Sequence, residues 1–238
     1  LVGSEMCIRD SLIFLLLSLT VSSQTYKYIG IEEGLSNQKI YKIQKDARGY
    51  MWFLTHVGID QYNGKEIKHY KLKEGNRELD PLLNINWTFL DKTGTLLVTG
   101  KQGRIFRYDS GHDRFVQIYS MYNYWNKDYH AFVRYSYIDQ EDNVWLCGKS
   151  AIHLFNIESG QKQQISNRLG NITCIEQINS EHFFIGTDKR IYLAKLENGN
   201  LKELSCGKLG MMDMHVHELY LHLSLIHISE PTRPRLIS

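Results

Sequence analysis

The residues of this sequence best suited to binding a ligand lie in the segment 119–132, which holds six aromatic side chains in fourteen positions. Aromatic faces suit the C–H surfaces of sugar rings, and the neighbouring Asn, Asp and His side chains can bond hydroxyl groups, a mixture typical of ligand sites. We therefore identify Trp125, Tyr124 and Tyr122 as candidate ligand-binding residues. The alternative is that these rings pack between structural units, because aromatic side chains dominate burial in protein cores.

A second candidate group is basic. Predicted turns in four successive parts of the chain contain His56, Lys101, Lys149 and Lys189. If these turns lie on one face of the protein, their cationic side chains would favour acidic sugars or sulfated glycans. Lysine side chains in loops are more often simply solvated, which leaves both interpretations open. The formal net charge is only +2, so charge gives no support for a nucleic-acid partner.

Signatures of catalysis and of metal binding are weak in this sequence. It contains no Gly-x-Ser-x-Gly elbow, P-loop or His-Glu-x-x-His motif. Asp46, Asp91 and Asp139 recur at one position of a repeat, and a residue repeated in this way is normally structural. His215 and His217 share one face of a predicted strand, but two ligands are too few for a closed metal site. We therefore expect no catalytic residue, no metal and no cofactor.

These candidates are positioned by a repeat of about forty-five residues, in which an acidic turn precedes a large apolar residue. The apolar positions are Trp52, Leu97, Trp145 and Phe184, which are 45, 48 and 39 residues apart. In the first copy, strand-forming runs at 40–45, 51–55, 59–62 and 67–72 are separated by turn residues. Asn63-Gly64 between two such runs is a strong hairpin signal, because both residues tolerate positive φ.

Four short strands per repeat predict an all-β protein, a β-propeller in which each blade is a four-stranded antiparallel sheet. We expect a partial propeller of about four blades, near 34–72, 79–119, 131–165 and 171–204, with the start of a fifth at 211–222. Such an array does not close into a ring. Cys147 and Cys174 fall in strand-like segments, where we expect buried small apolar residues, and the spacing of the cysteines does not allow a disulfide to be inferred.

The two ends of the chain are expected to differ in origin from the propeller, which we assign to 24–222. Residues 1–11 and 223–238 resemble translated sequencing adapter, because 6–10 and 223–228 can be encoded by DNA strings of which one contains the reverse complement of the other. We set both aside as artefacts. Residues 12–23 are an apolar run followed by small residues, which is typical of a truncated signal peptide and predicts export. The run is too short for a membrane helix, which needs about twenty residues.

The opening of the repeat resembles a known family. Glu33-Gly34-Leu35-Ser36-Asn37, followed by Asp46, Gly49, Trp52 and Gly58-Ile59-Asp60-Gln61-Tyr62-Asn63-Gly64, resembles the first blade of the two-component regulator propeller family. The resemblance covers about residues 28–197 and weakens toward the fourth blade. It implies the periplasmic sensor region of a hybrid two-component histidine kinase, a non-enzymatic part that senses an oligosaccharide or related nutrient. It also implies a homodimer in the full-length parent, with the kinase and the membrane attachment in downstream segments that this chain lacks.

Two alternatives stay open. A carbohydrate-active propeller enzyme, such as a polysaccharide lyase or a glycosidase, would use carboxylates or a Tyr/His pair in the axial pocket. A scaffold propeller would bind another protein.

Overall fold

The computed structural model describes residues 26–121, 132–197, 199–207, 219–221 and 226–228, and the fold of these residues is all-β. Four sheets of four strands each contain most of them. Within each sheet the strands follow one another in chain order, and every strand pairs antiparallel with the next. The prediction of a partial β-propeller with four-stranded blades in an unclosed array is confirmed.

The four sheets are the blades, and their bounds are as follows. Blade 1 comprises β1 (Ile40–Lys45), β2 (Met51–Thr55), β3 (Ile59–Tyr62) and β4 (Ile67–Tyr70). Blade 2 comprises β7 (Trp87–Leu90), β8 (Leu96–Thr99), β9 (Arg104–Asp109) and β10 (Arg114–Ser120). Blade 3 comprises β11 (Tyr135–Ile138), β12 (Asn143–Cys147), β13 (Ala151–Asn156) and β14 (Lys162–Ser166). Blade 4 comprises β15 (Ile172–Gln177), β16 (His182–Thr187), β17 (Ile191–Glu197) and β18 (Asn200–Gly207).

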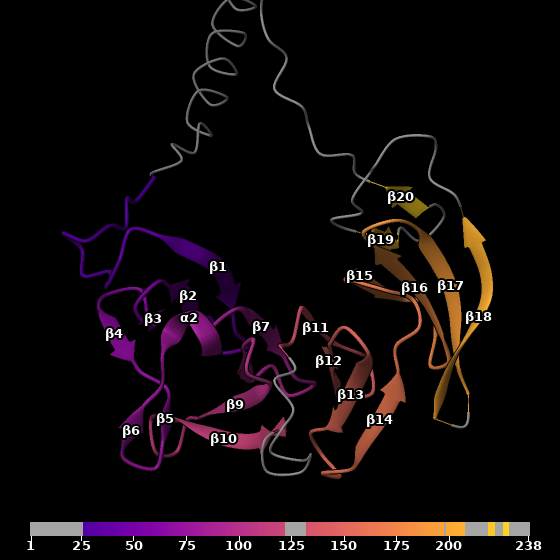
Figure 1. The fold of residues 1–238 in the computed structure, drawn as a ribbon. Coiled ribbons are helices and arrows are strands. Elements are labelled where there is room, and N and C mark those ends of the chain that lie inside the picture. The colour runs from indigo at the N-terminus through magenta and orange to yellow at the C-terminus, as the bar shows by residue number, and fades with distance from the viewer. Residues whose placement is uncertain (1–25, 122–131, 198, 208–218, 222–225, 229–238) are drawn as a thin grey trace, which may run out of the picture.

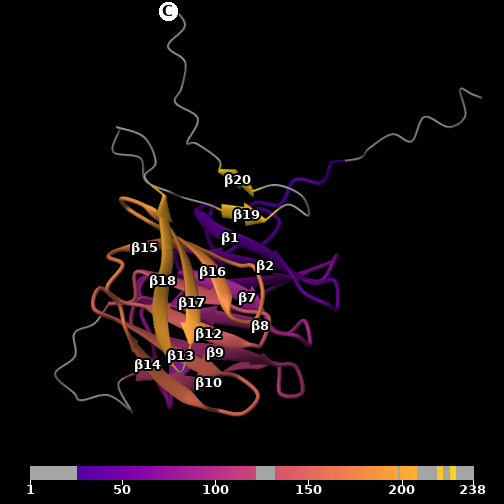
Figure 2. The same ribbon diagram turned by 90° about the vertical axis from the view of Figure 1, so that its right-hand side faces the viewer.

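The blades follow one another around an arc that is open between β1 and blade 4 (Figure 1). The first strands of neighbouring blades contact one another, β1 with β7, β7 with β11 and β11 with β15. They therefore lie on the inner side of the arc, and the fourth strands form its outer rim. Figure 2 looks at this rim from the side of blade 4, with β18 in front.

Large apolar side chains fill the spaces between the blades, because alternate residues of each strand point to opposite neighbours. Trp52 points toward blade 2 and is completely buried. Leu97 and Trp145 lie at the corresponding positions of the next two interfaces, also completely buried. Phe184 holds the same position in blade 4 but is only partly buried, because no described blade follows it. In the first three repeats the large apolar residue thus packs one blade on the next.

Neighbouring blades are also linked where the first strand turns into the second. The amide of Ala47 donates to the carbonyl of Gly94 at 3.2 Å, which joins the turns of blades 1 and 2. The amide of Lys92 donates to Asp142 Oδ1 at 3.1 Å, from blade 2 to blade 3. Gln177 of blade 4 accepts from the amide of Gln140 of blade 3 at 2.6 Å. We call these three contacts the turn-to-turn links.

The connection between blades 1 and 2 departs from the repeat. Residues 71–86 contain the hairpin β5 (Lys73–Glu74) and β6 (Arg77–Glu78) and the short helix α2 (Pro81–Asn84), whereas blades 3 and 4 are joined by residues 167–171 alone. Asp80 accepts from the amide of Leu82 and so caps α2, with Pro81 at its start.

The described part of the C-terminal region is a small hairpin. β19 (Leu219–Leu221) pairs with β20 (Ile226–Ile228), and β19 lies beside β15. β19 falls in the segment predicted to start a fifth blade, and β20 in the segment predicted to derive from adapter. Residues 211–218, with His215 and His217, and the predicted signal peptide at 12–23 lie outside the described residues. The described residues include no helix that is long and apolar enough to cross a membrane.

Candidate functional site

The turns between second and third strands lie on the same face as the connections between blades, because antiparallel strands return the chain to that face. Hydrogen bonds join the two sets. The amide of His56 donates to the carbonyl of Lys39 at 3.2 Å, that of Asn167 to Ser150 at 2.9 Å and that of Asp188 to Asn171 at 3.1 Å. We call this side of the propeller the connector face.

In blades 1 and 4 a threonine at the end of the second strand closes this turn. In blade 1, Thr55 Oγ1 donates to the carbonyl of Gly58 at 3.0 Å and accepts from the amide of the same residue at 3.2 Å. In blade 4, Thr187 Oγ1 donates to the carbonyl of Arg190 at 3.0 Å and accepts from its amide at 3.0 Å. The hydroxyl therefore holds the turn closed and leaves the side chains at its tip free to face solvent.

The predicted basic residues lie on the connector face, one in each blade. Lys101, Lys149 and Lys189 are exposed, and no ion pair among the described residues involves any of them. His56 is half-buried, with Nδ1 at 2.6 Å from the hydroxyl of Tyr41. The structure thus brings the four residues to one face, but no side-chain contact among the described residues joins any two of them.

The predicted aromatic site lies in the connection between blades 2 and 3. Trp125, Tyr124 and Tyr122 lie outside the described residues. Both ends of the connection are attached to the same turn of blade 2. The amide of Met121 donates to the carbonyl of Gly103 at 3.1 Å, and the amide of Val133 donates to that of Lys101 at 2.8 Å. The aromatic segment therefore leaves and rejoins the connector face beside Lys101.

Two other aromatic residues of this segment are described, and they differ. Tyr119 is 2% exposed and stacks on Phe155 of blade 3 with ring centroids 4.7 Å apart. It packs between blades, as the structural alternative for the segment predicts. Phe132 is 55% exposed. The first residue of the segment, Tyr119, is therefore part of the core, whereas the ring of its last residue, Phe132, is exposed to solvent.

The recurring carboxylates are structural in the described blades. Asp46 Oδ1 accepts from the amides of Arg48 and Tyr50, and its Oδ2 accepts from Trp52 Nε1 at 2.8 Å. Asp139 bonds its own turn in the same way and accepts from Trp145 Nε1 at 2.9 Å. The acid thus closes a turn and satisfies the buried indole N–H that follows it. The expectation that these repeated acids are structural agrees with this geometry.

Blade 2 replaces the tryptophan by Leu97 and changes the partner of the acid. Asp91 Oδ1 accepts from the amides of Thr93 and Thr95, as in the other turns. Its Oδ2 accepts from Arg107 Nε at 2.9 Å. Burial acts to raise the pKa of Asp91, but hydrogen bonds from the Thr93 hydroxyl and the Thr95 amide, together with the charge of Arg107, outweigh it and lower that pKa.

One side of blade 1 holds a serine, an aspartate and a histidine: Ser36, Asp60 and His69. Whether they could act as a catalytic triad depends on which of them contact one another. Asp60 is completely buried; its Oδ2 accepts from both the amide and the hydroxyl of Ser36 at 2.8 Å, and its Oδ1 lies 2.8 Å from His69 Nδ1. In a catalytic triad the histidine must contact the serine to take its proton. Here the serine bonds the aspartate and Thr55 instead. The arrangement anchors the Gly-Leu-Ser segment and lacks the geometry of a nucleophile.

The residues around Asp113 form a polar cluster that sequence reasoning missed. Tyr70 and Tyr108 each donate a hydroxyl to Asp113 Oδ1 at 2.6 Å, and Lys68 donates to Oδ2 at 3.1 Å. The two tyrosine hydroxyls, followed by Lys68, lower the pKa of Asp113 to about 2. Asp113 has a φ of 51°, a left-handed conformation that is uncommon outside glycine. An Asp in a short turn is the only sequence signal for this cluster.

The described residues include no group of three or more His, Cys, Asp or Glu side chains that could hold a metal ion. Cys147 and Cys174 are buried, as expected, and neither forms a disulfide with a described residue.

Comparison with known proteins bears on the first blade and on the fold. Residues 34–56 match the family model described as two component regulator propeller, which confirms the predicted resemblance over those residues. A comparison with curated proteins finds no match.

Solved structures share the fold. The chain resembles the extracellular domain of BT3049 from B. thetaiotaomicron, assigned as a hybrid two component system, with a TM-score of 0.58 and 17% identity. That similarity covers 75% of this chain and 26% of the other, so the chain spans about a quarter of that domain. It also resembles BamB from Moraxella catarrhalis, with a TM-score of 0.54 and 12% identity, over 82% of this chain and 60% of that protein.

Proposed function

We propose that this chain is part of the exported, periplasmic sensor propeller of a two-component regulatory protein, which binds an oligosaccharide or related nutrient and signals to a kinase outside the chain. The observation that carries the proposal is the match of residues 34–56 to the two component regulator propeller model. The fold likeness to an extracellular domain assigned to a hybrid two component system supports it.

The chemistry of the described residues supports binding rather than catalysis. The acids that recur in the repeat are each engaged by their own turn, and the acid beside Ser36 is buried and fully bonded. A glycosidase would need two carboxyl groups that face one substrate, one of them free to give up a proton. A sensor needs only complementary contacts.

The connector face supports an oligosaccharide as the ligand. Successive blades place Lys101, Lys149 and Lys189 there with no ion partner among the described residues. The aromatic segment with Trp125 joins the same face beside Lys101. Aromatic rings and a row of hydrogen-bond donors on successive blades suit an extended polar chain better than a compact ligand.

Signalling requires the ligand to bind two arrangements of the sensor with different affinity, since only differential binding shifts an equilibrium. Neighbouring blades are joined by buried apolar side chains and by the turn-to-turn links, and in this proposal the ligand changes the angle between blades at these interfaces. A ligand that spans several blades would favour one curvature of the arc. In a homodimer of the parent protein, that change would alter how the two copies meet.

Thermal unfolding of the full chain tests the proposal with a panel of neutral malto-oligosaccharides and acidic oligogalacturonates. A ligand present at a hundred times its Kd should stabilise the protein by about 2.7 kcal/mol. The double variant Lys101→Ala/Lys149→Ala and the single variant Trp125→Ala should each remove most of that stabilisation. Lys202→Ala, an exposed lysine on the outer strand β18, is the matched control and should leave it unchanged.

Two outcomes would overturn the proposal. The first is that no oligosaccharide of a broad panel changes the unfolding temperature of the protein. The other is a ligand-induced shift that persists in both connector-face variants and is therefore unrelated to that face.

A further inference from the structure

A tyrosine and a histidine meet where β1 begins, at the inner end of the connector face. Tyr41 Oη lies 2.6 Å from His56 Nδ1, within the reach that a general base requires. With the proton of the neutral imidazole on Nε2, Nδ1 accepts from the phenol. The pair therefore joins an oxygen nucleophile to a group that can take its proton.

A β-bulge places Tyr41 beside His56. The pairing of β1 with β2 shifts in register between Ile40 and Lys42, so Tyr41 is the extra residue of the bulge. Bulges re-aim side chains and are frequent next to active sites. The amide of His56 also donates to the carbonyl of Lys39 at 3.2 Å, which holds the turn with the histidine against the start of β1.

A cation lies beside this pair. Lys39 Nζ is over the ring of Tyr41, 5.5 Å from its centroid. No ion pair among the described residues involves Lys39. Its charge therefore helps to stabilise the phenolate that forms when the proton leaves Tyr41. We call Tyr41, His56 and Lys39 the tyrosine cluster.

The tyrosine cluster is not a shared part of the repeat. In blades 2, 3 and 4 the position of His56 is taken by Gly100, Gly148 and Asp188. The turn thus forms in the other three blades without a histidine, so the fold of a blade does not account for His56. Its contact with Tyr41 is a property of blade 1.

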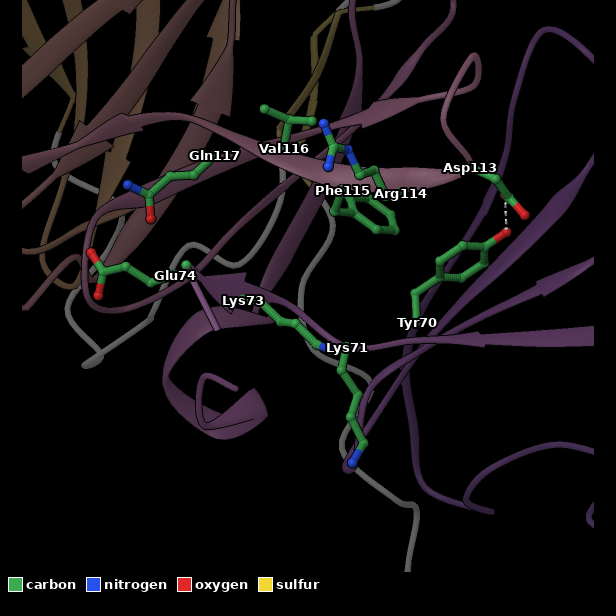
Figure 3. Close-up of a pocket in the computed structure, with 10 residues that line it drawn as sticks. Tyr70, Lys71, Lys73, Glu74, Asp113, Arg114, Phe115, Val116 and Gln117 are labelled. Atoms are coloured by element: carbon green, nitrogen blue, oxygen red, sulfur yellow. Dashed lines mark hydrogen bonds between the residues drawn. The ribbon is translucent and has the colours of Figure 1, made fainter. Parts of the chain in front are cut away.

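A tyrosine at the outer rim shows a contrasting, structural arrangement. Tyr70 donates its hydroxyl to Asp113 beside a cavity of about 510 Å³ (Figure 3). The pKa of Asp113 is about 2, so this carboxylate is too weak a base to take the proton of a phenol. Burial, followed by the hydrogen bond to Asp113, raises the pKa of Tyr70. Tyr70 is therefore held as a neutral hydroxyl, whereas Tyr41 is 43% exposed and faces a base.

We propose that Tyr41 is a nucleophilic tyrosine that accepts an acyl group from an activated ester, with His56 as its general base. The phenol oxygen attacks the carbonyl carbon, and its proton passes to His56 Nδ1. The bond from that carbon to the leaving oxygen then breaks, and the alcohol departs with the proton from the imidazole. The product is an acyl ester of Tyr41. Tyr41 contacts its histidine directly, which Ser36 does not.

Acetylation of the full chain by p-nitrophenyl acetate, located by mass spectrometry, tests the proposal. Tyr28 is the control, since it is 75% exposed and thus more accessible than Tyr41. Tyr41 should nevertheless react about a hundredfold faster, the lower end of what a positioned general base contributes. Tyr70 should stay unmodified. Equal rates at Tyr41 and Tyr28 would overturn the proposal.

Variants of the tyrosine cluster identify the base. His56→Gln keeps a polar side chain but removes the base, and it should slow the acetylation of Tyr41 about a hundredfold. Lys39→Ala should slow it about threefold, the effect of an exposed cation–π contact. Lys45→Ala, an exposed lysine at the other end of β1, is the matched control and should leave the rate unchanged. An unchanged rate in His56→Gln would show that the histidine is not the base.

The same reaction in denaturing urea needs no variant. The two tyrosines should then react at equal rates, because the bulge that brings Tyr41 to His56 is lost with the fold. An excess at Tyr41 that persists in urea would contradict the proposal, since it would come from the local sequence alone.

The double variant Lys101→Ala/Lys149→Ala separates the tyrosine cluster from the proposed sensor function, on which it does not rest. Tyr41 should be acetylated in this variant as in the unaltered chain, while oligosaccharide binding is weakened. Loss of the Tyr41 reaction would contradict its assignment to blade 1. A Tyr41 reaction in a protein that binds no oligosaccharide would support the tyrosine cluster and count against the sensor function alone.

Discussion

Replacing Asp139 by alanine should destabilise the protein more than the same replacement of Asp91. Both acids close the turn that precedes a second strand. In blade 3 the second carboxylate oxygen also accepts from Trp145 Nε1, and this tryptophan is completely buried. In blade 2 that oxygen is met by Arg107, whose side chain is 39% exposed.

The difference between the two variants follows from what each leaves behind. In Asp139→Ala the indole N–H of Trp145 stays in the core without a partner, which costs about 1–3 kcal/mol beyond the loss of the turn. In Asp91→Ala the guanidinium of Arg107 can turn to water, and its lost ion pair contributes no more than about 1 kcal/mol. We expect Asp139→Ala to lower the free energy of unfolding by about 1–3 kcal/mol more than Asp91→Ala.

Urea unfolding followed by far-ultraviolet circular dichroism measures both costs. A double-mutant cycle with Trp145→Phe isolates the hydrogen bond, because phenylalanine removes the N–H. In the Asp139→Ala background the same change should cost less by about 1–3 kcal/mol, since the N–H that it removes is already unpaired.

Two results would refute this reasoning. Equal costs for Asp139→Ala and Asp91→Ala would show that the buried indole N–H does not need its acceptor. A coupling energy of zero in the cycle would show that the acid acts only on its own turn.

Three further predictions concern stability. Gly49 and Gly94 hold the same turn position with φ of 88° and 73°, so Gly49→Ala should cost about 1–2 kcal/mol in urea unfolding. Gly94→Ala should cost more, because its Cβ would lie 2.3 Å from a side-chain carbon of the neighbouring turn, and equal costs would contradict this. Thr99→Val should be neutral or should stabilise the protein by up to about 1 kcal/mol, because Thr99 Oγ1 is buried without a partner among the described residues. Thr55→Val should destabilise it by about 1–3 kcal/mol, because it removes the hydroxyl that closes the turn. A larger cost for Thr99→Val than for Thr55→Val would contradict this prediction. Burial lowers the pKa of His153 from 6.5 to about 4, so the unfolded state binds more protons between these pH values. Thermal stability should therefore fall by up to about 3 kcal/mol as the pH drops from 6.5 to 4, and His153→Gln should flatten that dependence.

The blades could be predicted from the sequence because their signals are local. The strands predicted in the first copy at 40–45, 51–55 and 59–62 coincide with β1, β2 and β3, and only the fourth ends earlier, at Tyr70 rather than at 72. Alternating apolar residues and Asn-Gly turns act over a few positions, so they can be read without knowledge of the rest of the chain. The predicted positions of the large apolar residues are confirmed in the first three repeats, since Trp52, Leu97 and Trp145 each pack against the following blade.

The partners of individual side chains could not be predicted, because they depend on contacts between distant residues. The bond from Trp52 to Asp46 lies within one repeat, and yet spacing alone does not give the direction of an indole N–H. The meeting of Tyr70 with Asp113 requires the angle between two blades. The hairpin β5–β6 has too few residues for a periodic signal, so the cavity of about 510 Å³ between its strand β5 and β10 could not be predicted either.

For the candidate binding residues, the sequence predicts the position but not the function. Strand order alone places Lys101, Lys149 and Lys189 on one face, because every blade returns the chain in the same direction. Whether that face binds a ligand depends on side chains that come together from several blades. Their role stays a prediction, and so does that of Trp125, which lies outside the described residues.

The turn-to-turn links have a geometric consequence. Each link adds one or two hydrogen bonds to the apolar packing of its interface, as between Ala47 and Gly94, and the two together fix the angle between neighbouring blades. The curvature of the arc is therefore a sum of angular steps, and each step is set at one interface. A change at one link rotates every blade beyond it as a body, and the displacement grows with distance along the arc. The link between blades 2 and 3, in the middle, thus sets the separation of blades 1 and 4, and an alteration of a single turn there would move the two ends of the array further than it moves any neighbouring pair.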